Sequence, residues 1–336
     1  MADTKISALA AIDAVAAGDK VAVADASDLT LSKSATMTQI NTYLQTLGLA
    51  SAQITALGAA AAIAAAHTFP VSQSGTALEA TALQLRDYCS PRGYLWGLTM
   101  SNAADAANDI TVAAGEAKDE NGTVIMVLDS AITKQIDASW AVGTAAGGMN
   151  TGAVADSTWY EVHLIKRVDT GVVDVMFTTT ANRATLPTSY TLQRRIGWVR
   201  RGVSTNLAFT QIDDYFTLTT TVNDASFTAT ATAAPITMTA PPSSIVRFRG
   251  CVESSTAVNT TNATVFSEIV EGDKTPTETT GLASIGANDI AGASAGHYEM
   301  RVSSTSTIEH DSDGTTYTVD IGTFGWIDAR GQLSGT

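Results

Sequence analysis

The sequence predicts a mainly β protein, in which an N-terminal segment and a short helical stalk precede two β-sandwich, jelly-roll-like domains. Short apolar or alternating runs, separated by turn residues, recur from Tyr94 to Asp328. Alanine dominates residues 50–66, where it favours helix. A chain of 336 residues is long enough for two or three domains. We therefore expect an N-terminal segment at 1–49, a stalk and connector at 50–93, a central β-domain at 94–215 and a C-terminal β-sandwich at 216–336.

The central domain is expected to consist of β-strands joined by tight turns. Asp119–Gly122 and Asp169–Gly171 carry residues that tolerate the positive φ of hairpin turns. The run around Val124 is apolar throughout, which predicts a strand buried on both faces, whereas the run Thr158–Ile165 alternates, which predicts half burial. The predicted strand runs are Asp109–Ala117, Gly122–Leu128, Thr158–Ile165 and Gly171–Phe177.

The C-terminal domain begins with a Thr- and Ala-rich alternating stretch, residues 216–240. Several short strand-like runs follow, separated by Gly, Asn and Asp, and this spacing predicts a sandwich with a jelly-roll arrangement. The runs are Ile245–Val252, Thr264–Val270, His297–Val302, Thr307–His310 and Thr316–Asp328.

The N-terminal segment has strand-like alternation at Lys20–Asp25 and at Leu29–Lys33. A capped helix is expected from Thr36, with Gly48 at the favoured position after its end. Farther along the chain, Thr76–Asp87 could form a helix that ends before the break at Pro91.

The Ala-rich stalk shows a weak heptad pattern, typical of a coiled coil. One heptad position holds Leu47, Ile54 and Ala61, and the other holds Ala50, Leu57 and Ala64. So few large side chains cannot stabilise an isolated helix, which favours an intermolecular bundle. The alternative is a helix that lies on the β-domain of its own chain.

The charge and the residue inventory exclude several classes of function. A net charge of −14 argues against nucleic acid as a partner, because phosphate binding requires a basic face. Cys89 and Cys251 are far apart, so neither a disulfide framework nor a zinc site is expected. Residues 50–66 are too short and too weakly apolar for a membrane span, and no signal peptide is evident. We expect no cofactor and no membrane insertion.

Residues His310–Gly314 have acidic side chains that a calcium loop would use, but the later bidentate Glu is missing, and a hairpin turn is expected instead. The four histidines stand singly, so no metal site is expected. No nucleophile elbow supports a Ser-His-Asp triad, and we expect no catalytic residues.

Several runs in the central domain carry a resemblance to a known family. In one order along the chain they are Trp96–Asn102, Ile110–Glu116, Asp137–Gly143, Thr158–Tyr160, Ile165–Asp174, Leu186–Tyr190 and Arg194–Gly197. Together they resemble a module common in tail fibres and other structural proteins of tailed phages and prophages. The resemblance implies a virion protein, and it brings no catalytic residues.

The N-terminal segment resembles the virion-attachment segments of phage tail fibres and tailspikes. The expected attachment residues are Ile6, Leu9, Val21, Val23 and Ile40. An ordinary β-hairpin followed by a helix is the alternative. Because fibres of this kind are trimers, the resemblance implies a parallel homotrimer, and the expected stalk contacts are Leu47, Ile54, Leu57, Ala61 and Ala64.

The resulting expectation is a non-enzymatic tail fibre or spike that docks on other virion proteins of the tail, baseplate or capsid and binds a host-surface glycan as its receptor. Trp140 and Trp326 are the candidate glycan contacts. The arginine run Arg194–Arg201 could bind an acidic sugar, but pairing with carboxylates of neighbouring strands or of another subunit is favoured. The alternatives are a capsid head fibre or decoration protein and, more remotely, a glycan depolymerase, although no long β-helix repeat is visible.

Overall fold

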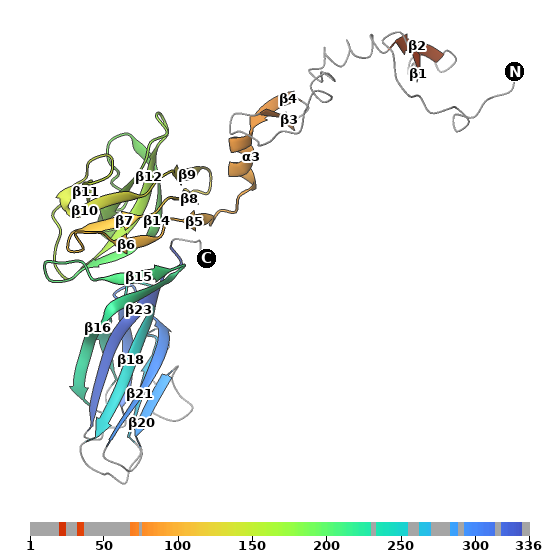
Figure 1. The fold of residues 1–336 in the computed structure, drawn as a ribbon. Coiled ribbons are helices and arrows are strands. Elements are labelled where there is room, and N and C mark those ends of the chain that lie inside the picture. Colours follow the sequence, from red (N-terminus) through yellow and green to blue (C-terminus); the bar gives the residue numbers. More distant parts are fainter. Residues whose placement is uncertain are drawn as a thin grey trace, which may run out of the picture. The chain divides into compact units, whose positions relative to one another are not determined.

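The computed structural model describes residues 20–24, 32–36, 68–73, 76–229, 233–254, 262–269, 283–287, 292–312 and 317–330. The chain divides into two compact units, Met1–Leu83 and Gln84–Thr336. The described residues are mainly β-strand, which confirms the predicted fold class at this level. Their one α-helix is α3, Ala82–Cys89 (Figure 1). No described helix is long and apolar enough to cross a membrane.

The first unit contains two antiparallel strand pairs. β1 (Lys20–Ala24) pairs with β2 (Ser32–Thr36), and β2 begins later than the run predicted at Leu29. β3 (Thr68–Gln73) pairs with β4 (Thr76–Thr81). The helix expected from Thr76 is therefore wrong in its first half: β-branched Thr76 and Thr81 bound a strand, and the helix begins only at Ala82.

The first part of the second unit has a seven-stranded sheet in the order β14-β12-β13-β11-β10-β7-β6 and a three-stranded sheet in the order β5-β8-β9 (Figure 1). The connection after β13 includes a short 3-10 helix, η2 (Thr180–Asn182). The strands are β5 (Leu95–Gly97), β6 (Met100–Asn102), β7 (Asp109–Val112), β8 (Gly115–Lys118), β9 (Ile125–Leu128), β10 (Ile132–Ser139), β11 (Ala146–Met149), β12 (Thr158–Arg167), β13 (Val173–Thr178) and β14 (Tyr190–Arg201).

The run predicted as one strand from Asp109 to Ala117 is two strands, β7 and β8, in different sheets. The chain crosses between the sheets at Ala113 and Ala114, where it meets the segment after Trp96. A Cβ on Gly115 would lie 2.4 Å from the Trp96 carbonyl oxygen, so the crossing requires glycine. Sequence alternation does not show such a change of sheet.

The two predicted hairpin turns are confirmed. Gly122 has φ +71°, and its N–H donates to the Asp119 carbonyl at 2.8 Å. Gly171 has φ +76° and bonds the Arg167 carbonyl in the same way at 3.0 Å. The apolar strand β9 is almost wholly buried, as expected from its composition.

The half-buried character predicted for β12 is wrong, because the six residues from Tyr160 to Ile165 are all buried. One face of β12 joins the main core. On the other face, Thr180 and Arg183 of the β13–β14 connection bond to Glu161 and cover it.

The second part of the unit has a five-stranded sheet, β15-β16-β23-β18-β21, and a four-stranded sheet, β17-β22-β19-β20. Neighbouring strands within both sheets are antiparallel. The strands are β15 (Phe209–Ile212), β16 (Tyr215–Thr228), β17 (Ala234–Thr237), β18 (Ile245–Ser254), β19 (Asn262–Ser267), β20 (Ala283–Ala287), β21 (Gly292–Arg301), β22 (Thr307–Ser312) and β23 (Thr318–Ile327). The turn expected at His310 starts later, because β22 continues to Ser312.

The inner faces of these two sheets pack together. Phe248 of the five-stranded sheet meets Phe266 of the four-stranded sheet edge to face, with ring centroids 5.3 Å apart. The same hydrophobic cluster continues through Phe216 and Trp326 into the first part of the unit, where Trp326 contacts Trp159 at 5.1 Å. The two parts therefore share one core, and the predicted boundary near Asp213 falls in the turn between β15 and β16.

Candidate functional site

The arginine run of β14 is used for internal contacts. Arg195 makes a two-pronged ion pair with Asp328, at 2.7 and 3.0 Å. Arg194, which is 1% exposed, faces the backbone carbonyls of Arg330, Lys118 and Gly93 at 3.4–3.5 Å.

The other two arginines of the run are held as well. Arg200 lies over the Trp159 ring, 5.6 Å from its centroid. Arg201 is buried and donates to the Ala107 carbonyl and to the Asn108 side chain. The run is therefore a structural element rather than a surface for an acidic sugar.

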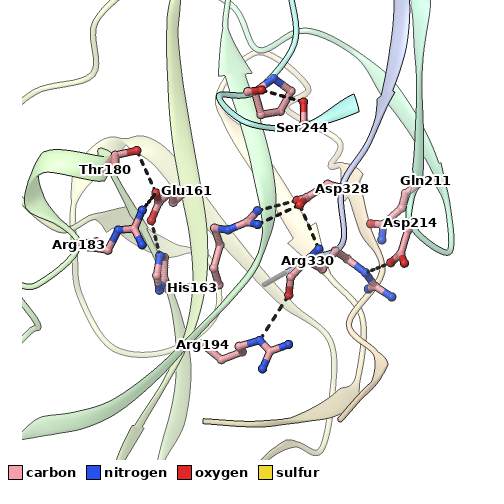
Figure 2. Close-up of polar contacts among 12 residues, drawn as sticks. Glu161, His163, Thr180, Arg183, Arg194, Gln211, Asp214, Ser244, Asp328 and Arg330 are labelled. Atoms are coloured by element: carbon pink, nitrogen blue, oxygen red, sulfur yellow. Dashed lines mark hydrogen bonds and ion pairs between the residues drawn. The ribbon is translucent and has the colours of Figure 1, made fainter. Parts of the chain in front are cut away.

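A polar joint connects the two parts of the second unit beside this run (Figure 2). Arg330 donates to the Asp214 carboxylate at 3.0 Å and to the Gly97 carbonyl at 3.1 Å. The backbone N–H of Arg330 donates to the carboxylate of Asp328, which is also the ion-pair partner of Arg195. These bonds fix the segment after β23 against both β5 and the β15–β16 turn.

A second polar cluster lies on the covered face of β12. Glu161 and His163 are fully buried, and their side chains are joined by a 2.8 Å contact between Oε2 and Nε2. Glu161 Oε1 accepts hydrogen bonds from Thr180 and from Arg183, both at 2.9 Å (Figure 2). Because no atom of Glu161 or His163 is open to solvent, this cluster holds the β13–β14 connection and offers no site for a substrate.

The charge of Glu161 depends on its partners. Burial alone would raise the pKa of Glu161, but hydrogen bonding and electrostatic attraction from His163, together with Thr180 and Arg183, bring it below its ordinary value. A carboxyl group with a depressed folded-state pKa stabilises the fold above its unfolded pKa of about 4.5, and this contribution is lost as the pH falls through the folded value.

We expect the free energy of unfolding of the wild type to fall more steeply below about pH 4.5 than that of Glu161→Gln. At pH 7 the variant should be less stable by about 1–3 kcal/mol, since it loses a buried charged acceptor that His163, Thr180 and Arg183 share. Urea unfolding between pH 7 and pH 3 measures both effects. Parallel pH profiles of the two proteins would contradict this role of Glu161.

Trp140 is half-buried rather than an open platform. Its indole N–H donates to the Val175 carbonyl at 3.1 Å, and Tyr190 packs edge to face on its ring at 5.2 Å. Lys134 lies 5.2 Å from the ring centroid. These contacts anchor the β10–β11 connection. The indole N–H has its hydrogen-bond acceptor and the ring has its packing partners within the protein.

The expectation that Trp326 contacts a glycan is corrected by its burial. The side chain is 1% exposed, and its ring stacks on Phe216 with an interplanar angle of 6° and a centroid distance of 5.0 Å. In the sheet register it lies opposite buried Phe216 and buried Val246, which places it on the inner face of the sandwich.

An exposed tryptophan stands elsewhere, at Trp96 on β5. Its side chain is 65% exposed, and in the register of β5 with β8 it lies directly opposite Glu116. Residues opposite each other in an antiparallel pair point to the same face. Glu116 Oε1 accepts the Tyr94 hydroxyl at 2.5 Å, and Oε2 accepts Arg86 Nη1 at 3.3 Å.

These contacts hold Glu116 in one orientation beside an open indole. The hydrogen bond to Glu116 raises the pKa of Tyr94 further above neutral pH, where a tyrosine hydroxyl is already protonated and donates. A carboxylate has about four acceptor positions, and two donors leave room for more. An open indole face with a fixed carboxylate beside it suits the apolar face and the hydroxyl groups of a sugar ring. We call Tyr94, Trp96, Glu116 and Arg86 the Trp96 surface.

Trp96 is not among the predicted glycan contacts, although the two-residue period of a β-strand predicts that its side chain faces outward. Leu95 packs on the core. Because successive side chains of a strand point to opposite faces, the next residue, Trp96, faces outward. Its pairing with Glu116 depends on strand register, and the contact with Arg86 depends on the position of α3. Neither can be read from the local sequence.

The predicted stalk and attachment residues lie largely outside the described residues. These are the stalk positions Leu47, Ile54, Leu57, Ala61 and Ala64, and the attachment positions Ile6, Leu9 and Ile40. Val21 and Val23 lie in β1, opposite Ala35 and Lys33 of β2. Their roles remain predictions.

Within the described ranges, no group of three or more His, Cys, Asp or Glu side chains is placed to hold a metal ion. Cys89 and Cys251 are free thiols. No family model matches the sequence, and a search of curated proteins finds no match either.

Proposed function

We propose that the chain is a non-enzymatic fibre or spike protein of a tailed-phage virion, which docks on the particle by its N-terminal segment, assembles as a homotrimer and binds a host-surface glycan for adsorption. The order of family-like runs from Trp96 to Gly197 supports the virion assignment. The mainly β architecture is compatible with it.

We further propose a jelly roll for the C-terminal sandwich. Its support is the strand order, in which β16-β23-β18-β21 face β17-β22-β19-β20. Successive strands change sheet at every step except between β19 and β20. Eight strands in two antiparallel four-stranded layers, with this alternation, are the pattern of a jelly roll, and β15 extends one layer at its edge.

The observation that carries glycan binding is the exposed Trp96 ring beside the fixed Glu116 carboxylate. Many exposed apolar side chains of the described chain are aliphatic, whereas this one presents a flat aromatic face next to a polar group held by Tyr94 and Arg86. A sugar ring requires both kinds of contact at once.

We expect Trp96→Ala to weaken binding to host-cell polysaccharide roughly tenfold or more, which is the loss expected for an aromatic anchor at the centre of a binding site. Trp96→Phe retains a ring and should retain part of the affinity. Titration of purified surface polysaccharide by isothermal calorimetry measures the effect. The matched control is Val203→Ala, at a 76% exposed apolar position, which should bind as the wild type does.

Equal affinities for wild type, Trp96→Ala and Val203→Ala would contradict a role of the Trp96 surface in adsorption. The position in the particle is tested separately, by electron microscopy of virions labelled with an antibody against residues 216–336. Label at the tail tip or baseplate supports a tail fibre, and label scattered over the head would replace it with a capsid fibre or decoration protein.

A further inference from the structure

The face of β5 and β8 that holds the Trp96 surface is covered at one end and open at the other. Lys118 shares this face with Glu116, because the two residues are two positions apart in β8. The Lys118 ammonium donates to the carbonyls of Asp87 and Ser90, at the end of α3, at 2.5 and 2.7 Å. Lys118 is therefore only 3% exposed, whereas Trp96 is 65% exposed. The end of α3 covers the Lys118 end of the face and leaves the Trp96 end open.

The polar group beside the open indole is an acceptor of hydrogen bonds. The Glu116 side chain is 19% exposed, so a ligand on Trp96 can reach it. Oε1 accepts the Tyr94 hydroxyl and Oε2 accepts Arg86. A carboxylate has about four acceptor positions, so each oxygen of Glu116 keeps one for a ligand. A group that binds there must donate a hydrogen bond, which a sugar hydroxyl does and a sugar carboxylate does not.

The cations that contact this part of the face are already paired within the protein. Arg86 lies between two carboxylates, with Nη1 3.3 Å from Glu116 and Nη2 3.6 Å from Asp87. Lys118 is buried, and two carbonyl oxygens hold its ammonium. The two positive charges of this group equal its two negative charges, so an anion gains no net attraction from it.

We propose that the Trp96 surface takes a neutral sugar and rejects acidic sugars, and that Glu116 determines this specificity. The sugar ring stacks on the Trp96 indole, and its hydroxyls donate to the two free acceptor positions of Glu116. A uronic or sialic acid in the same place brings its own carboxylate toward that of Glu116, and this like-charge contact opposes binding. The inference rests on the glycan binding of the proposed function, and it names the class of sugar.

The test uses immobilised oligosaccharides in matched pairs. Each pair is a neutral oligomer of glucose, galactose or mannose and its counterpart with C6 oxidised to a carboxylate. The full wild-type chain should bind at least one neutral oligomer and bind its oxidised counterpart roughly tenfold more weakly, measured by biolayer interferometry at low salt.

Glu116→Gln keeps an oxygen acceptor for Tyr94, removes the negative charge and adds an amide donor. We therefore expect the difference within the pair to shrink to about threefold or less. The matched control is Glu253→Gln, which removes an exposed acid on β18 of the C-terminal sandwich and should leave the tenfold difference in place. A difference that survives in Glu116→Gln would overturn the role of Glu116.

Salt provides a second measurement on the wild type, which needs no variant. Because the rejection is electrostatic, high salt should reduce the difference within each pair, and a difference that salt does not change would overturn the proposal. Equal affinities for neutral and oxidised oligomers, both lost in Trp96→Ala, would overturn the sugar class and leave glycan binding at Trp96 standing. Binding that Trp96→Ala does not alter, or no binding to any oligomer or to host polysaccharide, would overturn the proposed site together with the sugar class.

Discussion

Replacing Lys134 with methionine is expected to lower the free energy of unfolding by about 3–5 kcal/mol, because it removes one partner of a buried ion pair. Lys134 Nζ lies 3.2 Å from Asp174 Oδ1, and the two side chains are 0% and 1% exposed. Burial lowers the pKa of Lys134, and the Asp174 carboxylate opposes that shift. The ammonium also donates to the carbonyls of Ala141 and Gly143 at 2.5 and 3.1 Å.

Without the ammonium, the Asp174 carboxylate remains buried with no cation, although the N–H groups of Gly143 and Val175 still donate to it. The double variant Lys134→Met/Asp174→Asn should recover part of the loss, since it removes the uncompensated charge. Urea unfolding at pH 7 gives the values. The control is Arg167→Met, which breaks the exposed pair with Asp169 and should have little effect. Equal losses for the buried and exposed pairs would refute this account.

Gly147→Ala is expected to destabilise the fold by about 3 kcal/mol, through overpacking against backbone. A Cβ at Gly147 would lie 1.9 Å from the Ser139 carbonyl oxygen, where β11 runs parallel to β10. A backbone carbonyl within a sheet cannot move aside without disturbing the strand pairing. Thermal and urea unfolding of the purified variant measure the cost.

The comparison for Gly147 is Gly197→Ala. There a Cβ would meet the terminal methyl carbon of Met100 at 2.2 Å, and a flexible side chain can change rotamer to make room. Its loss of stability should therefore be clearly smaller. If Gly197→Ala proved as destabilising as Gly147→Ala, the distinction between backbone and side-chain obstruction would fail. Close strand packing thus explains Gly147 and its neighbour Gly148, where a Cβ would lie 2.6 Å from the Phe177 ring.

The fold class could be predicted from the sequence because strands and turns leave local signals. The positive φ of Gly122 and Gly171 follows from their place between apolar runs, and the runs at Ile245 and Thr307 begin where β18 and β22 begin. Such signals depend only on neighbouring residues.

The burial of individual side chains could not be predicted from the sequence, because it depends on contacts between residues far apart in the chain. The alternation of β12 predicts that one of its faces is exposed to solvent. Glu161 on that face is instead covered by residues of the β13–β14 connection. Trp326 and Trp96 both stand in strand-like runs, but one joins the shared core and the other faces solvent. Their difference follows from which sheet face packs on another sheet, and this is a property of the assembled topology.

The position of β23 in the five-stranded sheet also determines the order of events during biosynthesis. β23 lies between β16 and β18 and is the sole hydrogen-bonded link between them in that sheet. When β16 and β18 leave the ribosome, the strand that joins them has not yet been made. The edges of β16 and β18 that face β23 therefore stay unpaired until Thr318–Ile327 emerges, so the C-terminal sandwich completes its fold late.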